Sequence, residues 1–317
     1  MKALVTGGAG FIGSHLAEAL CRRGAQVVVV DNLCLGTLAN LAWKRPGDAL
    51  EFVQGDAGDE VLMRKIVPGC DWVFHEAAYP SVPWSVAEPI KSNDQNLDAA
   101  LRLLVLARDA KVRRFVFASS SAIYGDSPVS PKREDMAPNP LSPYGLQKFT
   151  AETYARQFHQ LYGLETVSLR YFNVFGPRQS FNSPYSGVIA RFCTMLLAGE
   201  RPRIFGDGLQ SRDFIYVANV VTANLLAAES PAERVAGRFF NVAGGQSITL
   251  LDLVTELNRL TGQSLPPHFE PPRVGDVRAS TADITALVQA TGYRVTVPWQ
   301  EGLRETLEFY RKGGGTS

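Results

Sequence analysis

The chain has 317 residues, of which 45% are hydrophobic and 20% charged, an ordinary globular composition that can bury a sizeable core. Its 32 Lys and Arg residues nearly cancel its 31 Asp and Glu residues, and no basic stripe is interleaved with aromatic residues, which argues against a nucleic-acid partner. No apolar run reaches the roughly 20 residues that a membrane span requires. The first six residues are interpreted as a strand and not as a signal peptide.

The four cysteines, at positions 21, 34, 70 and 193, are scattered and form no Cys-x-x-Cys pair. Reduced thiols in a cytoplasmic protein explain this spacing best, so we expect a cytoplasmic location and no metal site.

In the first half of the chain, short apolar runs alternate with helical patterns. We expect strands at Ala3–Thr6, Gln26–Val30, Glu51–Gln54, Trp72–Glu76 and Arg114–Ser119. Several of these runs are apolar almost throughout, which suits strands covered on both faces. We expect helices between them at Ser14–Arg23, Glu60–Ile66 and Asp94–Arg108. This alternation predicts an α/β fold with a Rossmann-like, doubly wound parallel sheet.

Beyond residue 169 the alternation loosens, and Gly, Pro and Asn become more frequent. Helices are still expected at Val188–Ala198, Val217–Ala228, Leu250–Leu260 and Gln300–Tyr310. Thr249 and Asp252 resemble a capping pair at the start of the third of these. We therefore predict a doubly wound domain over residues 1–169 and a smaller mixed α/β lobe over residues 170–317, interleaved with the first. A cleft between them is the expected ligand site.

A glycine-rich turn follows the first predicted strand and opens a helix. Gly7 permits the tight turn, Gly10 lets the backbone approach a pyrophosphate, and Gly13 lets the helix pack close to the strand. A pyrophosphate would then lie at the positive end of the helix dipole, against the N–H groups of a turn that includes Phe11 and Ile12. A purely structural glycine turn is the alternative, but the strand before and the helix after favour a dinucleotide site.

Acidic residues end the second and third predicted strands. Asp31 lies 18 residues after Gly13, close to the usual interval of ~20 for the acid that accepts hydrogen bonds from the adenosine ribose. A carboxylate there repels a 2′-phosphate, so NAD is favoured over NADP, and we assign the adjacent Asn32 to the same site. Asp56, followed by Ala57, is a candidate acceptor for the adenine amine, although a plain turn aspartate is an alternative.

The run His75-Glu76-Ala77-Ala78 follows the fourth predicted strand. The small side chains of Ala77 and Ala78 leave room for the cofactor. His75 is interpreted as a packed, hydrogen-bonded histidine and not as a catalyst.

Tyr144 and Lys148 stand four residues apart, which places them on one face of a helix. A free tyrosine has a pKa of about 10, and a nearby ammonium and a cationic nicotinamide both favour the phenolate. Tyr144 is therefore a candidate base that removes a proton from a substrate hydroxyl while hydride leaves the same carbon. A Tyr and a Lys four residues apart occur in many helices by chance. The glycine turn upstream is what supports a catalytic interpretation of this pair.

Three serines, Ser119–Ser121, end the fifth predicted strand. Ligands of open α/β sheets bind beyond the carboxyl ends of the strands, where such hydroxyls can donate to a substrate oxygen and relay its proton. The alternative is that they only satisfy the backbone of a turn.

Together these motifs resemble the extended short-chain dehydrogenase/reductases, in the NAD-dependent epimerase/dehydratase group, over nearly the whole chain. The resemblance is carried by Thr6–Gly13, Ser119–Gly125, Tyr144–Lys148, Arg170–Pro177, Gly206–Gly208, Arg212–Phe214 and Arg273–Asp276.

The resemblance implies roles for individual residues. Ser120, Tyr144 and Lys148 take the catalytic roles, with Lys148 also binding the nicotinamide ribose. Phe172 is expected near the nicotinamide, and Asn173 against the sugar diphosphate.

Further residues are assigned to the substrate by the same resemblance. Arg212 and Arg273 are expected to bind the diphosphate, since guanidinium groups suit phosphate geometry. Ser121, Val188 and Asp276 complete the predicted substrate site.

Two positions narrow the implied reaction to 4-epimerisation of a UDP-sugar. The related dehydratases and decarboxylases carry Glu where this chain has Ala122, which has no ionisable group. Where similar epimerases carry a large Tyr, this chain has Ser280, which leaves space for a 2-N-acetyl group. UDP-GlcNAc and UDP-GalNAc are therefore favoured as substrates, with UDP-Glc/UDP-Gal and UDP-uronic acids as alternatives. The competing interpretation is that Ser280 is a turn serine that says nothing about the substrate.

Two other functions stay open: a net NAD-dependent dehydrogenase or reductase of a sugar nucleotide, and a non-catalytic NAD-binding scaffold or sensor. The resemblance also implies a homodimer through a four-helix bundle built from the regions Asp94–Arg108 and Tyr144–Tyr162. Apolar residues recur in the first region at helical spacing, at Leu97, Ala100, Leu101, Leu104 and Val105.

Overall fold

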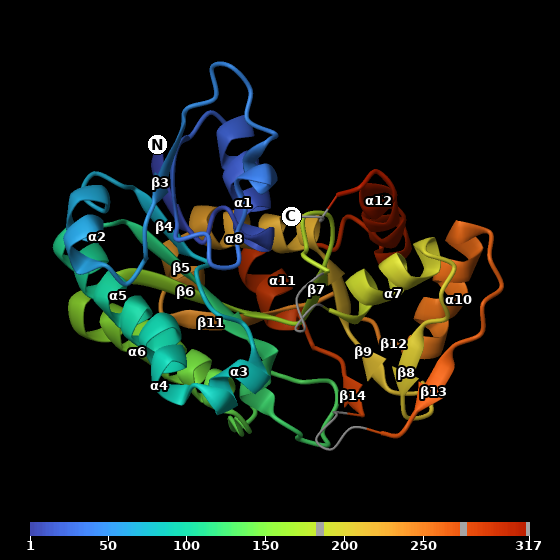
Figure 1. Ribbon diagram of the computed structural model, residues 1–317. Helices are drawn as coiled ribbons and strands as arrows, with labels where there is room; N and C mark the ends of the chain where they lie inside the picture. Colours follow the sequence, from blue (N-terminus) through green and yellow to red (C-terminus); the bar gives the residue numbers. More distant parts are fainter. Residues whose placement is uncertain (182–186, 273–277, 315–317) are drawn as a thin grey trace.

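The computed structural model describes residues 1–181, 187–272 and 278–314. A seven-stranded parallel sheet forms its larger layer, in the order β11-β6-β5-β4-β1-β2-β3 (Figure 1). The strands are β1 (Lys2–Thr6), β2 (Gln26–Asp31), β3 (Leu50–Gln54), β4 (Trp72–His75), β5 (Arg114–Ser120), β6 (Glu165–Tyr171) and β11 (Arg238–Val242).

Strand β2 shows why this sheet is covered on both faces. Its four valines are all buried, and their side chains alternate between the faces of the sheet. Val27 and Val29 pack into one apolar core, whereas Val28 and Val30 pack into the other. A continuous apolar run therefore makes a doubly covered strand.

Helices from distant parts of the chain cover the two faces (Figure 1). One face carries α1 (Phe11–Arg22), α8 (Val217–Glu229) and α11 (Thr285–Thr291). The other carries α2 (Glu60–Ile66), α5 (Ala99–Asp109) and α6 (Pro143–Tyr162).

A second lobe lies beside the sheet and has its own apolar core, built mainly by α7 (Val188–Leu197), α10 (Leu250–Thr261) and α12 (Trp299–Arg311) (Figure 1). Short strands pair within it: β7 (Asn173–Phe175) with β10 (Phe214–Tyr216), β8 (Arg203–Phe205) with β13 (His268–Glu270), and β9 (Ser211–Arg212) with both β12 (Ile248–Thr249) and β14 (Ala279–Ser280). The remaining short elements are η1 (Leu38–Leu41), α3 (Val82–Ala87), α4 (Pro89–Asn93), the π-helical turn η2 (Asp94–Asp98), η3 (Ser121–Tyr124) and α9 (Ala232–Val235).

The predicted fold class and doubly wound sheet are confirmed. The five predicted strands occur within one residue of their expected ends, and the predicted helix Asp94–Arg108 is the π-helical turn η2 followed by α5. Thr249 and Asp252 form the expected capping box at the start of α10. The second half of the chain contributes β11, α8 and α11 to the sheet layer, and the domain boundary at residue 169 stays a prediction. In the three described stretches, none of the helices has the length and apolarity to cross a bilayer.

Candidate active site

The turn after β1 and the first turn of α1 leave no room for side chains at Gly7 and Gly13. Gly7 has a φ of +69°, and a Cβ there would lie 2.7 Å from the backbone nitrogen of Ala77. A Cβ at Gly13 would collide with the carbonyl oxygen of Gly7. Helix α1 begins at Phe11, and its N-cap residue, Gly10, has no side chain that could accept a hydrogen bond from the N–H groups of the first turn. This terminus therefore suits the close approach of a pyrophosphate.

A cavity of about 950 Å³ opens at the carboxyl ends of β1, β2 and β4. Every residue that the sequence assigned to the cofactor lines it: Gly7, Gly10, Phe11, Ile12, Gly13, Asp31, Asn32, Asp56, Ala57, Ala77, Ala78, Tyr144, Lys148 and Phe172. The glycine turn, two strand-end acids and the Tyr–Lys pair thus surround one space large enough for a dinucleotide.

The acids at the ends of β2 and β3 are held by short hydrogen bonds. Asp31 accepts from the backbone nitrogens of Ala9 at 3.0 Å and Leu33 at 2.8 Å. Burial raises the pKa of its carboxyl, and these backbone bonds oppose the rise. Asp56 accepts from the side-chain nitrogen of Asn32 at 2.8 Å. Both carboxylates therefore stand fixed at the cavity wall, where adenosine hydroxyl and amine donors would meet them.

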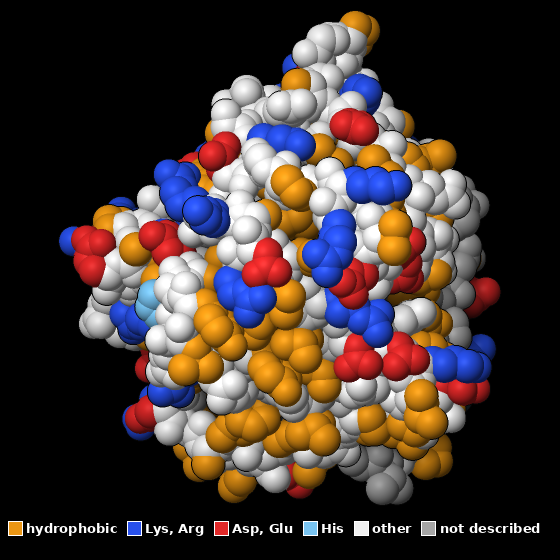
Figure 2. Space-filling model, turned by 90° about the vertical axis from the view of Figure 1, so that its left-hand side faces the viewer, with side chains coloured by type: hydrophobic (Ala, Val, Ile, Leu, Met, Phe, Trp, Pro, Cys, Tyr) orange, Lys and Arg blue, Asp and Glu red, His pale blue; other side chains and the backbone are white. Residues whose placement is uncertain are grey.

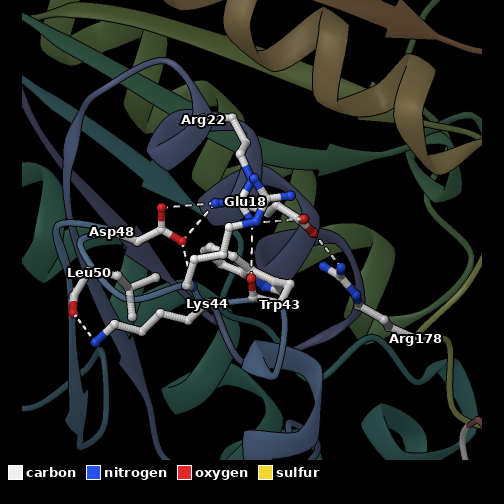
Figure 3. A network of polar contacts seen from close by, with 8 residues as sticks. Glu18, Arg22, Trp43, Lys44, Asp48, Leu50 and Arg178 are labelled. Carbon is white, nitrogen blue, oxygen red and sulfur yellow. Dashed lines mark hydrogen bonds and ion pairs between the residues drawn. The ribbon is translucent and has the colours of Figure 1, made fainter.

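An ion-pair network ties this end of the cavity to α1 and to the second lobe (Figure 3). Arg22 donates to both oxygens of Asp48, at 2.9 and 2.7 Å, and to the carbonyl of Trp43 at 2.9 Å. Glu18, one turn earlier in α1, pairs with Arg22 and with Arg178 of the segment after β7. The loop after β2, which lines the cavity, is thereby fastened to its surroundings.

Helix α6 carries the Tyr–Lys pair into the cavity. Ser142 caps its start by accepting from the backbone nitrogen of Gly145 at 3.1 Å. Lys148 is buried and donates to the carbonyl of Ala118 at 2.7 Å, which puts its nitrogen 6.0 Å from the Tyr144 ring centre. Burial lowers the pKa of Lys148 to about 8.

Ser120 and Tyr144 both line the larger cavity, and the Ser120 side chain favours the ionised form of the Tyr144 phenol. The Ser120 oxygen accepts from the backbone nitrogen of Ala122 at 3.1 Å, which fixes its position at the end of β5. Burial raises the pKa of the Tyr144 phenol, and the nearby Ser120 hydroxyl opposes this rise only in part. The expected lowering therefore needs a further positive charge, such as a nicotinamide ring facing the phenol.

A buried polar network supports the serine run from behind. Ser119 donates to Glu152 at 2.7 Å, and Arg170 donates to the same carboxylate at 2.6 to 3.2 Å. Arg170 also donates to the hydroxyl of Tyr124 at 2.8 Å, which in turn donates to Asn241 at 2.7 Å. Ser119 is thus part of this buried network, whereas Ser120 lines the cavity beside Tyr144.

The interpretation of His75 as a packed histidine is confirmed. It is fully buried, with its Nδ1 2.7 Å from the hydroxyl of Thr6, and burial lowers the pKa of its imidazole to about 3.

A second cavity of about 250 Å³ adjoins the first. Its walls include five residues assigned to the substrate or the reaction: Ser120, Ser121, Asn173, Arg212 and Ser280. Ser120, Phe172 and Asn173 line both cavities. A ligand in the smaller space would therefore reach the Ser–Tyr pair beside the larger one.

Asp213 holds the strands that present this second cavity. Its side chain is fully buried and accepts from the backbone nitrogens of Gly244 at 2.7 Å and Ala282 at 3.1 Å. Its own backbone nitrogen donates to the carbonyl of Ser280 at 2.6 Å. The carboxylate thus keeps Arg212 and Ser280 side by side on β9 and β14.

Among the assigned residues that the structure describes, Val188 does not line either cavity. Val188 begins α7 and packs against the core of the second lobe, so its contact with substrate stays a prediction. Arg273 and Asp276 lie outside the described residues.

The sequence interpretation missed several residues that line the larger cavity, among them Glu76, Tyr171 and Arg178. Glu76 carried a usable signal, because a carboxyl directly after an apolar strand falls at the ligand-binding edge of the sheet. Tyr171 and Arg178 carried none, since their approach to the cavity depends on the packing of distant segments.

Residues 3–243 match the family model described as the NAD dependent epimerase/dehydratase family. The chain belongs to this family. It is an NAD-dependent epimerase, an isomerase of the extended short-chain dehydrogenase/reductase type, and the recognition made from its motifs is confirmed.

Individual relatives cover nearly the whole chain. A UDP-glucose 4-epimerase from Mycolicibacterium smegmatis is 39% identical over 98% of this chain and 99% of its own. A UDP-N-acetylglucosamine 4-epimerase from Methanobrevibacter ruminantium, solved with UDP-N-acetylmuramic acid, is 41% identical over 98% of both chains, with a TM-score of 0.93. A Thermus thermophilus UDP-glucose 4-epimerase, solved with NAD, is 36% identical over 98% of this chain and 99% of its own, with a TM-score of 0.87.

Proposed function

We propose that this epimerase inverts C4 of a UDP-linked sugar, with UDP-GlcNAc and UDP-GalNAc as its favoured pair. The observation that carries the proposal is the junction of the two cavities at Ser120, Phe172 and Asn173. The larger cavity suits a dinucleotide, and the smaller one offers a guanidinium and hydroxyl groups directly beside the Ser–Tyr pair.

In this mechanism NAD, when bound, supplies the reversible acceptor for a hydride from C4. Tyr144 would take the proton of the C4 hydroxyl, and Ser120, which lines the cavity beside the phenol, would relay it. The Lys148 ammonium stabilises the phenolate from one helical turn away. Arg212 would hold the diphosphate, so that the 4-keto sugar could turn over without leaving. The hydride would then return to the other face of C4, and Tyr144 would give the proton back to the C4 oxygen.

The choice of sugar rests on Ser280. Its small side chain lines the smaller cavity beside Arg212 and leaves volume for a 2-N-acetyl group. Ala122, in the same wall, has no ionisable group, which argues against elimination or decarboxylation. UDP-Glc/UDP-Gal and UDP-uronic acids are the alternative substrates.

We further propose that the enzyme is a homodimer. Helix α5 and the turn η2 before it carry the apolar residues expected at the interface. Ala100 and Leu104 are buried against the sheet, whereas Leu97, Leu101 and Val105 are only partly buried. The latter three follow one another at helical spacing and form a single stripe. Figure 2, viewed from the side of α2, α4, α5 and α6, shows hydrophobic side chains gathered over the lower half of this face. A four-helix bundle with a second copy would cover them.

The four cysteines carry free thiols. This supports, as part of the proposal, a location in the reducing cytoplasm.

The test is to incubate the purified protein separately with UDP-GlcNAc, UDP-Glc and UDP-GlcA and to read C4 inversion by proton NMR while following NADH absorbance. We expect UDP-GalNAc to form without a stoichiometric absorbance change. A stoichiometric change would show a net dehydrogenase or reductase, and no conversion with tight NAD binding would favour a scaffold or sensor.

A further inference from the structure

Glu76 brings a carboxyl to the wall of the larger cavity, directly after β4. The hydroxyl of Tyr171 donates to its Oε1 at 2.8 Å. The side-chain nitrogen of Asn224, a fully buried residue of α8, donates to the same hydroxyl at 2.7 Å. Strand β6 and helix α8 thus fix the orientation of this carboxyl.

Lys148 reaches the same part of the cavity wall. Its nitrogen lies 4.9 Å from the ring centre of Phe117, which is the register partner of His75, the residue directly before Glu76. Burial raises the pKa of Glu76 to about 7, while the Tyr171 bond and the positive charge of Lys148 oppose the rise. Conversely, burial lowers the pKa of Lys148, and the negative charge of Glu76 opposes that fall. Each group therefore favours the charged form of the other.

The other ionisable groups around the pair do not duplicate this effect. His75 of β4 is neutral, because burial depresses the pKa of its imidazole to about 3. Glu152, one turn after Lys148 on α6, is engaged by Arg170 and Ser119. Burial keeps Tyr144 of α6 and Tyr171 of β6 protonated in the protein alone, since it raises the pKa of both phenols.

We propose that Glu76 is a positioning residue that holds Lys148 in its charged, catalytically useful form, with Tyr171 and Asn224 fixing the carboxylate for that task. The inference rests on the proposed function of Lys148 as the electrostatic partner of Tyr144. Without the carboxylate, Lys148 loses its proton at lower pH, and the phenolate of Tyr144 then loses its support.

The sign of the effect follows from the charges. Catalysis needs the Lys148 ammonium, so activity falls as pH rises through the pKa of this lysine. Glu76→Gln keeps an acceptor for Tyr171 but removes the charge, so the alkaline fall should move to lower pH by about one unit. Glu76→Asp keeps the charge and should keep the alkaline fall near its original pH.

The experiment compares these variants with the parent enzyme in the NAD-bound form. The first readout is the pH dependence of kcat from about pH 6 to about pH 10. The second is the carbon-13 signal of the Lys148 side chain next to its ammonium, titrated by NMR and assigned with Lys148→Arg. Glu134→Gln is the matched control, because it removes another partly buried carboxyl that accepts a backbone hydrogen bond, from Asn241 at 2.8 Å.

We expect both readouts to move to lower pH in Glu76→Gln and to stay in place in Glu76→Asp and Glu134→Gln. An unchanged Lys148 titration in Glu76→Gln, or a loss of kcat that is equal at every pH, would overturn the inference. The NMR titration needs no substrate, so it decides the role of Glu76 even if no UDP-sugar is epimerised, which would instead contradict the proposed function.

Discussion

Arg212 of β9 and Ser280 of β14 are register partners in a parallel ladder, and both line the smaller cavity. Partners in adjacent strands point to the same face, so a larger side chain at position 280 would fill space next to the guanidinium. We predict that Ser280→Tyr lowers kcat/KM for UDP-GlcNAc by at least about 10-fold while UDP-Glc is affected much less. The check is C4 inversion of each substrate by NMR, with Ser280→Ala as a control that keeps the space open. Equal losses for both sugars would remove Ser280 from substrate choice.

The Arg170–Glu152 pair is almost completely buried, with side chains 2% and 3% exposed. We predict that Glu152→Gln lowers the free energy of unfolding by about 3–5 kcal/mol, because it leaves a buried guanidinium without its counter-charge. Urea denaturation measures the change. Glu256→Gln breaks a surface pair with Arg259, whose side chain is 67% exposed, and should cost less than about 1 kcal/mol. A similar loss of unfolding free energy in the two variants would show that burial does not determine how much an ion pair stabilises this protein.

Two histidines should make the fold sensitive to acid. Burial lowers the pKa of His15 from 6.5 to about 4 and that of His75 to about 3. Since the folded protein prefers the neutral rings, their stabilisation is complete above pH 6.5 and is lost as the pH falls toward these lower values.

His15→Gln tests this directly, because a glutamine keeps a donor for the carbonyl of Pro177, now 2.9 Å from the His15 ring nitrogen. Between pH 6.5 and pH 4 we expect the free energy of unfolding of this variant to fall less steeply than that of the parent. The difference in slope should correspond to about one fewer proton taken up on unfolding. Exposed His268→Gln should follow the parent curve. A parent-like acid slope in His15→Gln would refute the assignment.

The proposed dimer predicts that one charge on the apolar stripe separates the subunits. Leu101→Glu places a carboxylate between Leu97 and Val105, where a second copy would have to bury it unpaired. Light scattering should then give the mass of one chain, whereas Arg102→Glu, a charge reversal at an exposed neighbour, should leave the dimer intact. A parent enzyme that is already monomeric at micromolar concentration would rule out the dimer.

Local chemistry made much of this molecule predictable from its sequence. The glycine turn at Gly7–Gly13 and the spacing of Tyr144 and Lys148 each operate within one or two elements, and the structure brings them to one cavity. The pairing of Arg212 with Ser280 joins segments far apart in the chain, so local patterns could not predict it, and the family resemblance assigned each residue to the substrate separately. The position of Glu76 directly after an apolar strand could have placed it at the cavity, but its hydrogen bond from Tyr171 of β6, which Asn224 of α8 supports, could not be predicted from the pattern around β4.

The most direct test of the account follows the hydrogen on C4. The enzyme is incubated in ordinary water with UDP-GlcNAc that carries deuterium at C4, and the UDP-GalNAc formed is examined by NMR and mass spectrometry. If Tyr144 moves only the hydroxyl proton while the C4 hydride goes to NAD and returns, the product keeps its deuterium. Conversion with loss of deuterium to water, or conversion at full rate in Tyr144→Phe, would contradict the account.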